Sequence, residues 1–263
     1  MSFIKSLHMD CAQSEPFPYD VPAIKYAKHL DFGSTVTFII GDNGTGKSTL
    51  LETLAFRLQL PHLDGSTYER GTFWAAKKLV NDLEIEFNIE RTTGFFFRAE
   101  EFGNQINKID RQDTSLFHRF KALEGKVSES VIAAMRYSAD TQRQHVRKNI
   151  GHEIDFLSHG EAYLDIMQRK LQQAGIFVLD EPESALSPAR QLTLIHQIMS
   201  HLKDHHSQFI IATHSPMLMA IPGATIYEVT SETMEKTALE DTEHFTITRN
   251  FLNNPEAYLR HLG

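Results

Sequence analysis

The segment with the clearest chemistry is a glycine-rich run, GDNGTGKST, at residues 41–49. It fits the pattern G-x-x-x-x-G-K-[ST], and it stands between a short β-branched apolar run and a helical pattern. Its glycines let the backbone fold tightly, so that successive N–H groups can point at a polyphosphate. Lys47 would reach the β- and γ-phosphates, and the Ser48 hydroxyl would ligate Mg²⁺. We therefore predict a nucleotide site formed by Gly41, Asp42, Asn43, Gly44, Thr45, Gly46, Lys47, Ser48 and Thr49.

Two adjacent carboxylates follow a second apolar run, in IFVLDEPE at residues 176–183. If this run is a buried strand, Asp180 lies at its carboxyl end, where it can hold the Mg²⁺ shell. Glu181 is then placed to polarise an attacking water. The alternative is an acidic turn at the end of a strand, without a catalytic role.

Two shorter motifs could complete such a site. In LSHGE, residues 157–161, Ser158 and Glu161 form a capping box in front of an amphipathic helix, and Gly160 allows close approach of another backbone. We predict a second anion site at Ser158, His159 and Gly160, although a plain helix cap is the alternative.

The fourth motif is ATHSP, residues 212–216. Its His214 could reach a γ-phosphate or the attacking water, whereas a lone histidine is more often structural.

The surrounding sequence predicts the elements that must position these residues. Strands are expected at 35–40, 83–90, 94–98, 176–179 and 208–213, where short apolar or alternating runs occur. Helical spacing of apolar residues follows Lys47, recurs over 160–174, and recurs again around Leu194 to Leu202. Strands that alternate with helices at these lengths indicate an α/β fold with a parallel sheet covered on both faces.

The composition excludes several classes of protein. The chain has 263 residues, enough for one large α/β domain or two small ones, and its net charge of −8 excludes a globally basic nucleic-acid binder. Cys11 is the single cysteine, which excludes an internal disulfide and a cysteine-based zinc site. No apolar run is long enough to cross a bilayer, and the N-terminal residues lack a secretory signal. We expect a cytoplasmic protein without a membrane partner.

The order of the four motifs resembles an ABC-type ATPase head, a P-loop NTPase. Within that superfamily the chain is similar to the soluble branch that includes the heads of structural-maintenance-of-chromosomes proteins and recombination ATPases. It looks most like small stand-alone predicted ATPases of bacteria, in stretches such as LDEPESALSPARQLTLI (179–195) and FLNNPEAYLRHL (251–262). The resemblance implies a mostly parallel core sheet, an antiparallel β region and a short helical subdomain. It implies one domain over residues 1–263, with the helical subdomain inserted at about 102–160.

The resemblance also implies a homodimer with ATP and Mg²⁺ at its interface. Each ATP would lie between residues 41–49 of one subunit and residues 158–160 of the other. Glu181 would be the catalytic base, His214 the γ-phosphate switch, and Lys47 the third catalytic group. The glutamine that senses Mg²⁺ in such heads is missing, and Glu100 is the nearest candidate, followed by Gln105.

These observations leave three functions open. The first is an ATP-driven soluble switch that acts on a partner protein or on nucleic acid. The second is the ATP-binding subunit of a membrane transporter, and the third is a regulator that binds nucleotide and barely hydrolyses it. Residues 108–148 hold nine basic and five acidic residues, a local charge of +4, and could offer nucleic acid a basic surface. Arg143, Arg147 and Lys148 are the best candidates, whereas a solvated helical face is the alternative.

Overall fold

A six-stranded sheet forms the centre of the computed structural model, which describes residues 2–10, 16–63, 73–89, 93–99 and 159–260. Its strand order is β5-β6-β7-β3-β8-β9. The first five strands run parallel and β9 runs antiparallel to β8. The strands are β5 (Gly94–Arg98), β6 (Ile176–Asp180), β7 (Gln208–Ala212), β3 (Val36–Gly41), β8 (Thr225–Val229) and β9 (Met234–Thr237). The predicted α/β fold with a mostly parallel sheet is confirmed.

A second, antiparallel sheet has the order β2-β1-β4. It consists of β2 (Leu30–Asp31), β1 (Ile4–Met9) and β4 (Leu83–Phe87). This is the antiparallel β region that the resemblance implies, and β4 ends three residues before the bound expected from the sequence.

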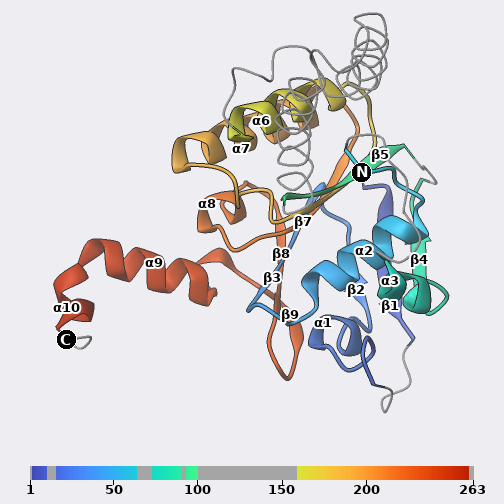
Figure 1. The fold of residues 1–263 in the computed structure, drawn as a ribbon, viewed down its shortest axis with the longest axis horizontal. Helices are drawn as coiled ribbons and strands as arrows, with labels where there is room; N and C mark the ends of the chain where they lie inside the picture. Colours follow the sequence, from blue (N-terminus) through green and yellow to red (C-terminus); the bar gives the residue numbers. More distant parts are fainter. Residues whose placement is uncertain (1, 11–15, 64–72, 90–92, 100–158, 261–263) are drawn as a thin grey trace, which may run out of the picture.

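Helices cover both faces of the central sheet (Figure 1). On one face lies α2 (Lys47–Arg57), with α1 (Pro22–Lys25) and α3 (Trp74–Leu79) beside it. On the other face lie α6 (His159–Lys170), α7 (Pro188–Asp204) and α8 (Pro216–Met219). Side chains that alternate along each strand therefore enter two separate cores. In β3, Ile39 packs in the core under α2, while Phe38 and Ile40 pack in the core under α6 and α7.

The two sheets are joined by the side chain of Gln208, the first residue of β7. Gln208 is fully buried. Its Oε1 accepts hydrogen bonds from Phe3 N at 3.0 Å and Ile4 N at 2.8 Å. Its Nε2 donates to Phe32 O at 2.7 Å. One amide thus connects the central sheet to β1 and to the segment after β2.

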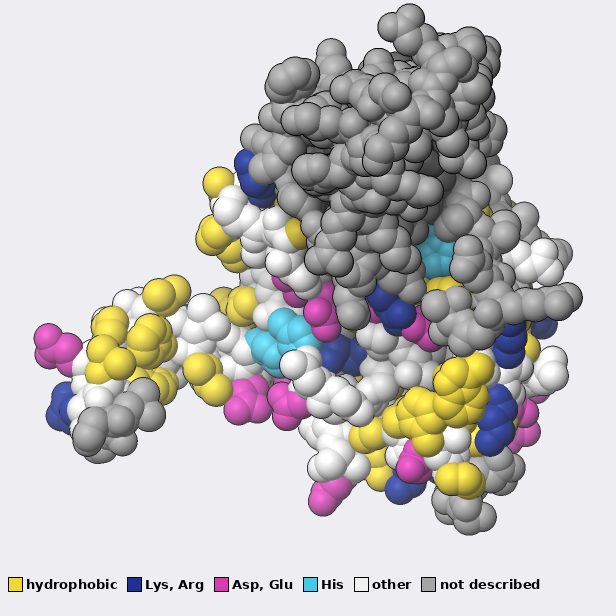
Figure 2. Space-filling view, viewed as in Figure 1, with side chains coloured by type: hydrophobic (Ala, Val, Ile, Leu, Met, Phe, Trp, Pro, Cys, Tyr) yellow, Lys and Arg dark blue, Asp and Glu magenta, His cyan; other side chains and the backbone are white. Residues whose placement is uncertain are grey.

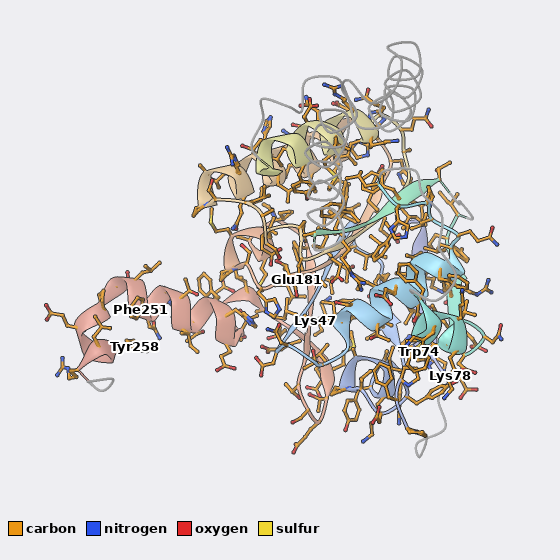
Figure 3. The ribbon with its side chains drawn as sticks, in the orientation of Figure 1. Lys47, Trp74, Lys78, Glu181, Phe251 and Tyr258 are labelled. Carbon is orange, nitrogen blue, oxygen red and sulfur yellow. The ribbon has the colours of Figure 1, made fainter. Side chains whose placement is uncertain are left out.

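The C-terminal helices project from the body of the molecule (Figure 1). A short 3₁₀ turn (Leu239–Asp241) leads into α9 (Glu243–Asn253), and α10 (Pro255–Leu259) folds back beside it. No residue of α9 or α10 is buried. Large apolar side chains gather on this arm, as Figure 2 shows, and Leu252 is 70% exposed. Phe251 and Tyr258, labelled in Figure 3, place their rings 5.8 Å apart.

Some expectations fall outside the described residues. The helical subdomain up to residue 158, including the basic residues of 108–148, is among them, so the division of the chain into one domain and an insertion stays a prediction. Among the described helices none is both long and apolar enough to cross a membrane.

Candidate functional site

The predicted site residues gather at one edge of the central sheet because three neighbouring strands end there. β6, β7 and β3 lie side by side and run parallel. The acidic pair follows β6, His214 follows β7, and the glycine-rich loop follows β3. In open α/β sheets, ligands bind outside the carboxyl ends of the strands. Figure 3 shows Lys47 and Glu181 close together at this edge.

The glycine-rich loop has a backbone that other residues would not adopt. Gly41 has φ +141° and Gly46 has φ +90°. A Cβ at Gly41 would lie 2.2 Å from Val229 O, and one at Gly46 would lie 2.6 Å from Val21 Cγ2. Gly46 is also the N-cap of α2, so the loop leads directly into the N-terminus of this helix. This geometry fits a polyphosphate, which backbone N–H groups and the helix dipole would stabilise.

Lys47 is held over the loop rather than extended into solvent. It is buried, and its Nζ donates to Gly41 O at 2.7 Å and to Asp42 O at 2.9 Å. Burial lowers the pKa of Lys47, while the nearby carboxylates of Glu181 and Asp180 oppose that shift. Lys47 is thus a desolvated cation whose present partners are neutral carbonyls. A phosphate at the loop would offer it a stronger, charged acceptor.

Ser48 and Asp180 form the predicted metal pair. The Ser48 Oγ donates to Asp180 Oδ1 at 3.1 Å, which joins the start of α2 to the end of β6. Asp180 is buried, and burial raises the pKa of its carboxyl group, an effect that Arg98 opposes. A hydroxyl and a carboxylate are oxygen ligands of the kind that Mg²⁺ takes, together with phosphate oxygens and waters. These two residues fit such an ion.

Arg98, which the sequence analysis did not single out, lies beside this pair. Its Nε donates to Asp180 Oδ2 at 3.0 Å, and its guanidinium also pairs with Glu52 of α2. All three side chains are largely buried. The sequence offered one clue, since Arg98 ends a predicted strand in the same way that Asp180 does.

Glu181 has an unusual backbone for a glutamate. Its φ is +49°, in the left-handed region, and its N–H donates to Ala212 O of β7 at 2.9 Å. The Ser184 Oγ donates to Glu181 Oε2 at 3.2 Å. The Glu181 side chain is 40% exposed. The carboxylate therefore stands at the open edge of the site, where it can accept a proton from water.

His214 connects Glu181 to two residues that the sequence analysis missed, Glu183 and His244. Its Nε2 lies 3.5 Å from Glu181 Oε1, and its Nδ1 lies 3.0 Å from Nε2 of His244. Its backbone N–H donates to Glu183 Oε1 at 2.6 Å. Burial, helped by the nearby Lys47, lowers the pKa of His214. Glu183 stands in the same acidic turn as Glu181, but nothing in the sequence connects His244 with a residue thirty positions earlier.

Several predicted site residues are not tested by this geometry. Ser158 and Glu100 lie outside the described residues. His159 and Gly160 occupy the first turn of α6, and their side chains are not described. The described part of the chain contains no group of three histidine, cysteine, aspartate or glutamate side chains that could hold a metal ion alone. An ion at Ser48 and Asp180 would need ligands from the nucleotide, from water or from other residues.

Comparison with known proteins finds a matching family and several relatives. The model of the RecF/RecN/SMC N-terminal domain family matches residues 23–238. The probable ABC transporter ATP-binding protein p29 of Mesomycoplasma hyorhinis is 25% identical over 197 residues, which cover 73% of this chain and 75% of that protein. An uncharacterized ABC transporter ATP-binding protein of Haemophilus influenzae is 27% identical over 205 residues, 76% of this chain and 72% of that protein.

Among solved structures, the SMC head domain from Thermotoga maritima aligns with 90% of this chain and 98% of its own length, at 14% identity and a TM-score of 0.45. The family match confirms the resemblance to an ABC-type ATPase head and, with it, the expected ATPase activity. The chain belongs to the RecF/RecN/SMC N-terminal domain family.

Proposed function

We propose that two copies of the chain close on two molecules of Mg-ATP, hydrolyse them, and use the closing and opening as a conformational switch on a partner. The observation that carries this proposal is the convergence of four groups at one sheet edge: a buried lysine, a hydroxyl–carboxylate pair, a second carboxylate and a histidine. The expected localisation is the cytoplasm.

Each residue has a defined task in this proposal. The loop amides and Lys47 bind the phosphates, and Lys47 neutralises charge on the β- and γ-phosphates. Ser48 and Asp180 hold Mg²⁺, which supplies charge stabilisation at the phosphate oxygens. Glu181 accepts a proton from the attacking water, and His214 donates a hydrogen bond near the γ-phosphate.

The dimer rests on the predicted second anion site. The side chains of Glu181 and His214 are 40% and 29% exposed, which leaves surface at this edge that a second copy could cover. Residues 158–160 of a second copy would cover this edge and complete the site. The resemblance to ABC-type heads supports this arrangement.

Sedimentation of Glu181→Gln with ATP tests the closed dimer. The amide keeps the size of the side chain but cannot accept a proton, so ATP should persist and the dimer should accumulate. Glu235→Gln, which changes an exposed carboxylate on β9, is the matched control and should behave as wild type. A Glu181→Gln protein that stays monomeric with ATP, while wild type dimerises, would refute the sandwich.

A mixing experiment tests whether the site is shared. Lys47→Ala damages the loop half and Ser158→Arg the other half, so a mixture of the two should regain one working site per mixed dimer. The double variant mixed with Lys47→Ala contains no intact loop and should stay inactive. If the first mixture is also inactive while both proteins are folded, the site is built within one chain.

The transporter subunit is the second candidate, and the names of the curated relatives favour it. Fractionation of the native cell separates the two, because a transporter subunit should follow the membranes. The third candidate, a regulator that barely hydrolyses ATP, predicts nucleotide binding without measurable turnover. Glu181 at the open edge of the site favours hydrolysis.

Nucleic acid as the partner stays a prediction that rests on the charge of residues 108–148. Binding through such a surface should weaken steeply as salt is raised. Arg143→Glu/Arg147→Glu should weaken DNA or RNA binding measured with ATP present. Binding that is absent at low salt, or unchanged by the double charge reversal, would leave a protein as the expected partner.

A further inference from the structure

We propose that His244 is a positioning residue: it holds the imidazole of His214 in the tautomer whose Nε2 carries the proton. The role assigned to His214 rests on the proposed function, but its tautomer is a property of the nucleotide-free protein. The proposal can therefore be tested apart from ATP hydrolysis.

The two imidazoles come from different parts of the chain and meet at hydrogen-bonding distance. His214 follows β7, and His244 lies in the first turn of α9. His214 Nδ1 and His244 Nε2 are 3.0 Å apart, and the ring planes are inclined by 46°. On its other side, His214 presents Nε2 to Glu181 Oε1 at 3.5 Å. The three side chains form one row, Glu181–His214–His244.

The start of α9 is the part of that helix fixed to the body. Thr242, its N-cap, is fully buried. The Thr242 hydroxyl donates to Leu239 O at 2.8 Å and accepts from Phe245 N at 3.3 Å. These bonds fix the backbone on both sides of His244, whereas α9 itself has no buried residue. An anchored cap next to the ring is what a positioning residue requires.

The chemistry of the row selects one arrangement of protons. A neutral imidazole carries one N–H, and burial with the nearby positive Lys47 favours the neutral form of His214. One proton must lie between His214 Nδ1 and His244 Nε2. If His214 supplied it, its Nε2 would be a bare lone pair facing the Glu181 carboxylate, which is repulsive. If His244 supplies it, His214 keeps its proton on Nε2, the nitrogen that lies 3.5 Å from Glu181 Oε1.

The tautomer can be read directly. Long-range ¹⁵N–¹H correlation spectra of the nucleotide-free protein distinguish protonated from bare imidazole nitrogens, and His214→Gln identifies the signals of His214 by their loss. We expect a protonated Nε2 and a bare Nδ1 for His214 in wild type. A proton on Nδ1 instead would overturn the proposal without any variant of His244.

Variants of His244 test whether this residue sets the tautomer of His214. His244→Phe keeps a ring but has no donor, so His214 should populate both tautomers, and kcat should fall about tenfold with little change in KM. His244→Gln can still donate an N–H, so it should keep the wild-type tautomer and most of kcat. His196→Phe, at an exposed position on α7, is the matched control and should change neither readout.

The outcomes separate this inference from the proposed function. Unchanged His214 signals in folded His244→Phe, or no rescue by folded His244→Gln, would overturn the positioning role even if ATP is hydrolysed. The expected tautomers in a wild-type protein that hydrolyses no ATP would leave the positioning role standing and refute the proposed function.

Discussion

Replacing Gln208 by leucine should remove a large part of the stability of the protein. The side chain is fully buried and satisfies three buried backbone groups at short distance: Phe3 N, Ile4 N and Phe32 O. Leucine has a similar size but no polar atom, so these groups lose their partner without gaining water. Each buried group left unsatisfied costs about 1–3 kcal/mol. Some relaxation of the backbone reduces the total, so we expect a loss of about 3–6 kcal/mol.

That loss is large against a total stability of about 5–15 kcal/mol. For a chain of this size it corresponds to a fall in Tm of roughly 6–24 °C. The free energy of unfolding should be measured by urea titration followed by circular dichroism, with the slope of the transition compared between variants. Gln172→Leu, at an exposed position just after α6, is the matched control and should stay within about 0.5 kcal/mol of wild type.

A loss of less than about 1 kcal/mol for Gln208→Leu, with an unchanged slope, would refute this reasoning. It would mean that the antiparallel sheet does not depend on the amide for its attachment to β7. The apolar contacts of Phe3, Ile4 and Phe32 in the core under α2 would then be sufficient.

Three further predictions concern the site and its surroundings. Lys47→Ala should abolish Mg-ATP binding in calorimetry, because the loop loses its desolvated cation; undiminished affinity in a folded variant would contradict the assignment of the loop. Arg98→Met should lower the free energy of unfolding by about 3–5 kcal/mol, because it removes the buried guanidinium that pairs with the carboxylates of Glu52 and Asp180. Lys5→Met, which breaks an exposed pair, should cost far less than Arg98→Met, and equal losses would contradict the importance of burial. Burial lowers the pKa of His201 in the folded state, so the unfolded chain binds the proton more readily and stability should fall as pH drops below about 6.5. His201→Gln should flatten that fall in urea titrations, and an identical slope would exclude the contribution of His201.

The central strands could be predicted from the sequence because each is a short local run of apolar residues. The buried strands β3, β6 and β7 are short apolar runs; β3 and β6 end in the site residues Gly41 and Asp180, and His214 follows two residues after the end of β7. Parallel strands bring their carboxyl ends to one edge, so Lys47, Asp180 and His214 could be placed together from the sequence alone.

The remaining features depend on contacts between residues far apart in the chain, which periodicity does not report. From the sequence, Gln208 is only a polar residue at the start of a strand. In the structure its side chain forms hydrogen bonds with backbone groups 176 to 205 positions away. Arg98 has a partner in α2 and another at the end of β6. The amphipathic pattern of α9 gives no indication that the helix carries a histidine into the site while the rest of its surface stays exposed.

The left-handed backbone at Glu181 affects which residues could replace this glutamate. A non-glycine residue held in that region costs of order 1 kcal/mol, and glycine or asparagine would be accommodated more easily. Neither of those residues has a carboxylate. Backbone preference and proton acceptance are therefore opposed at this one residue. Under the proposed function, a change of Glu181 to glycine would relieve the backbone and at the same time remove the group that accepts the proton.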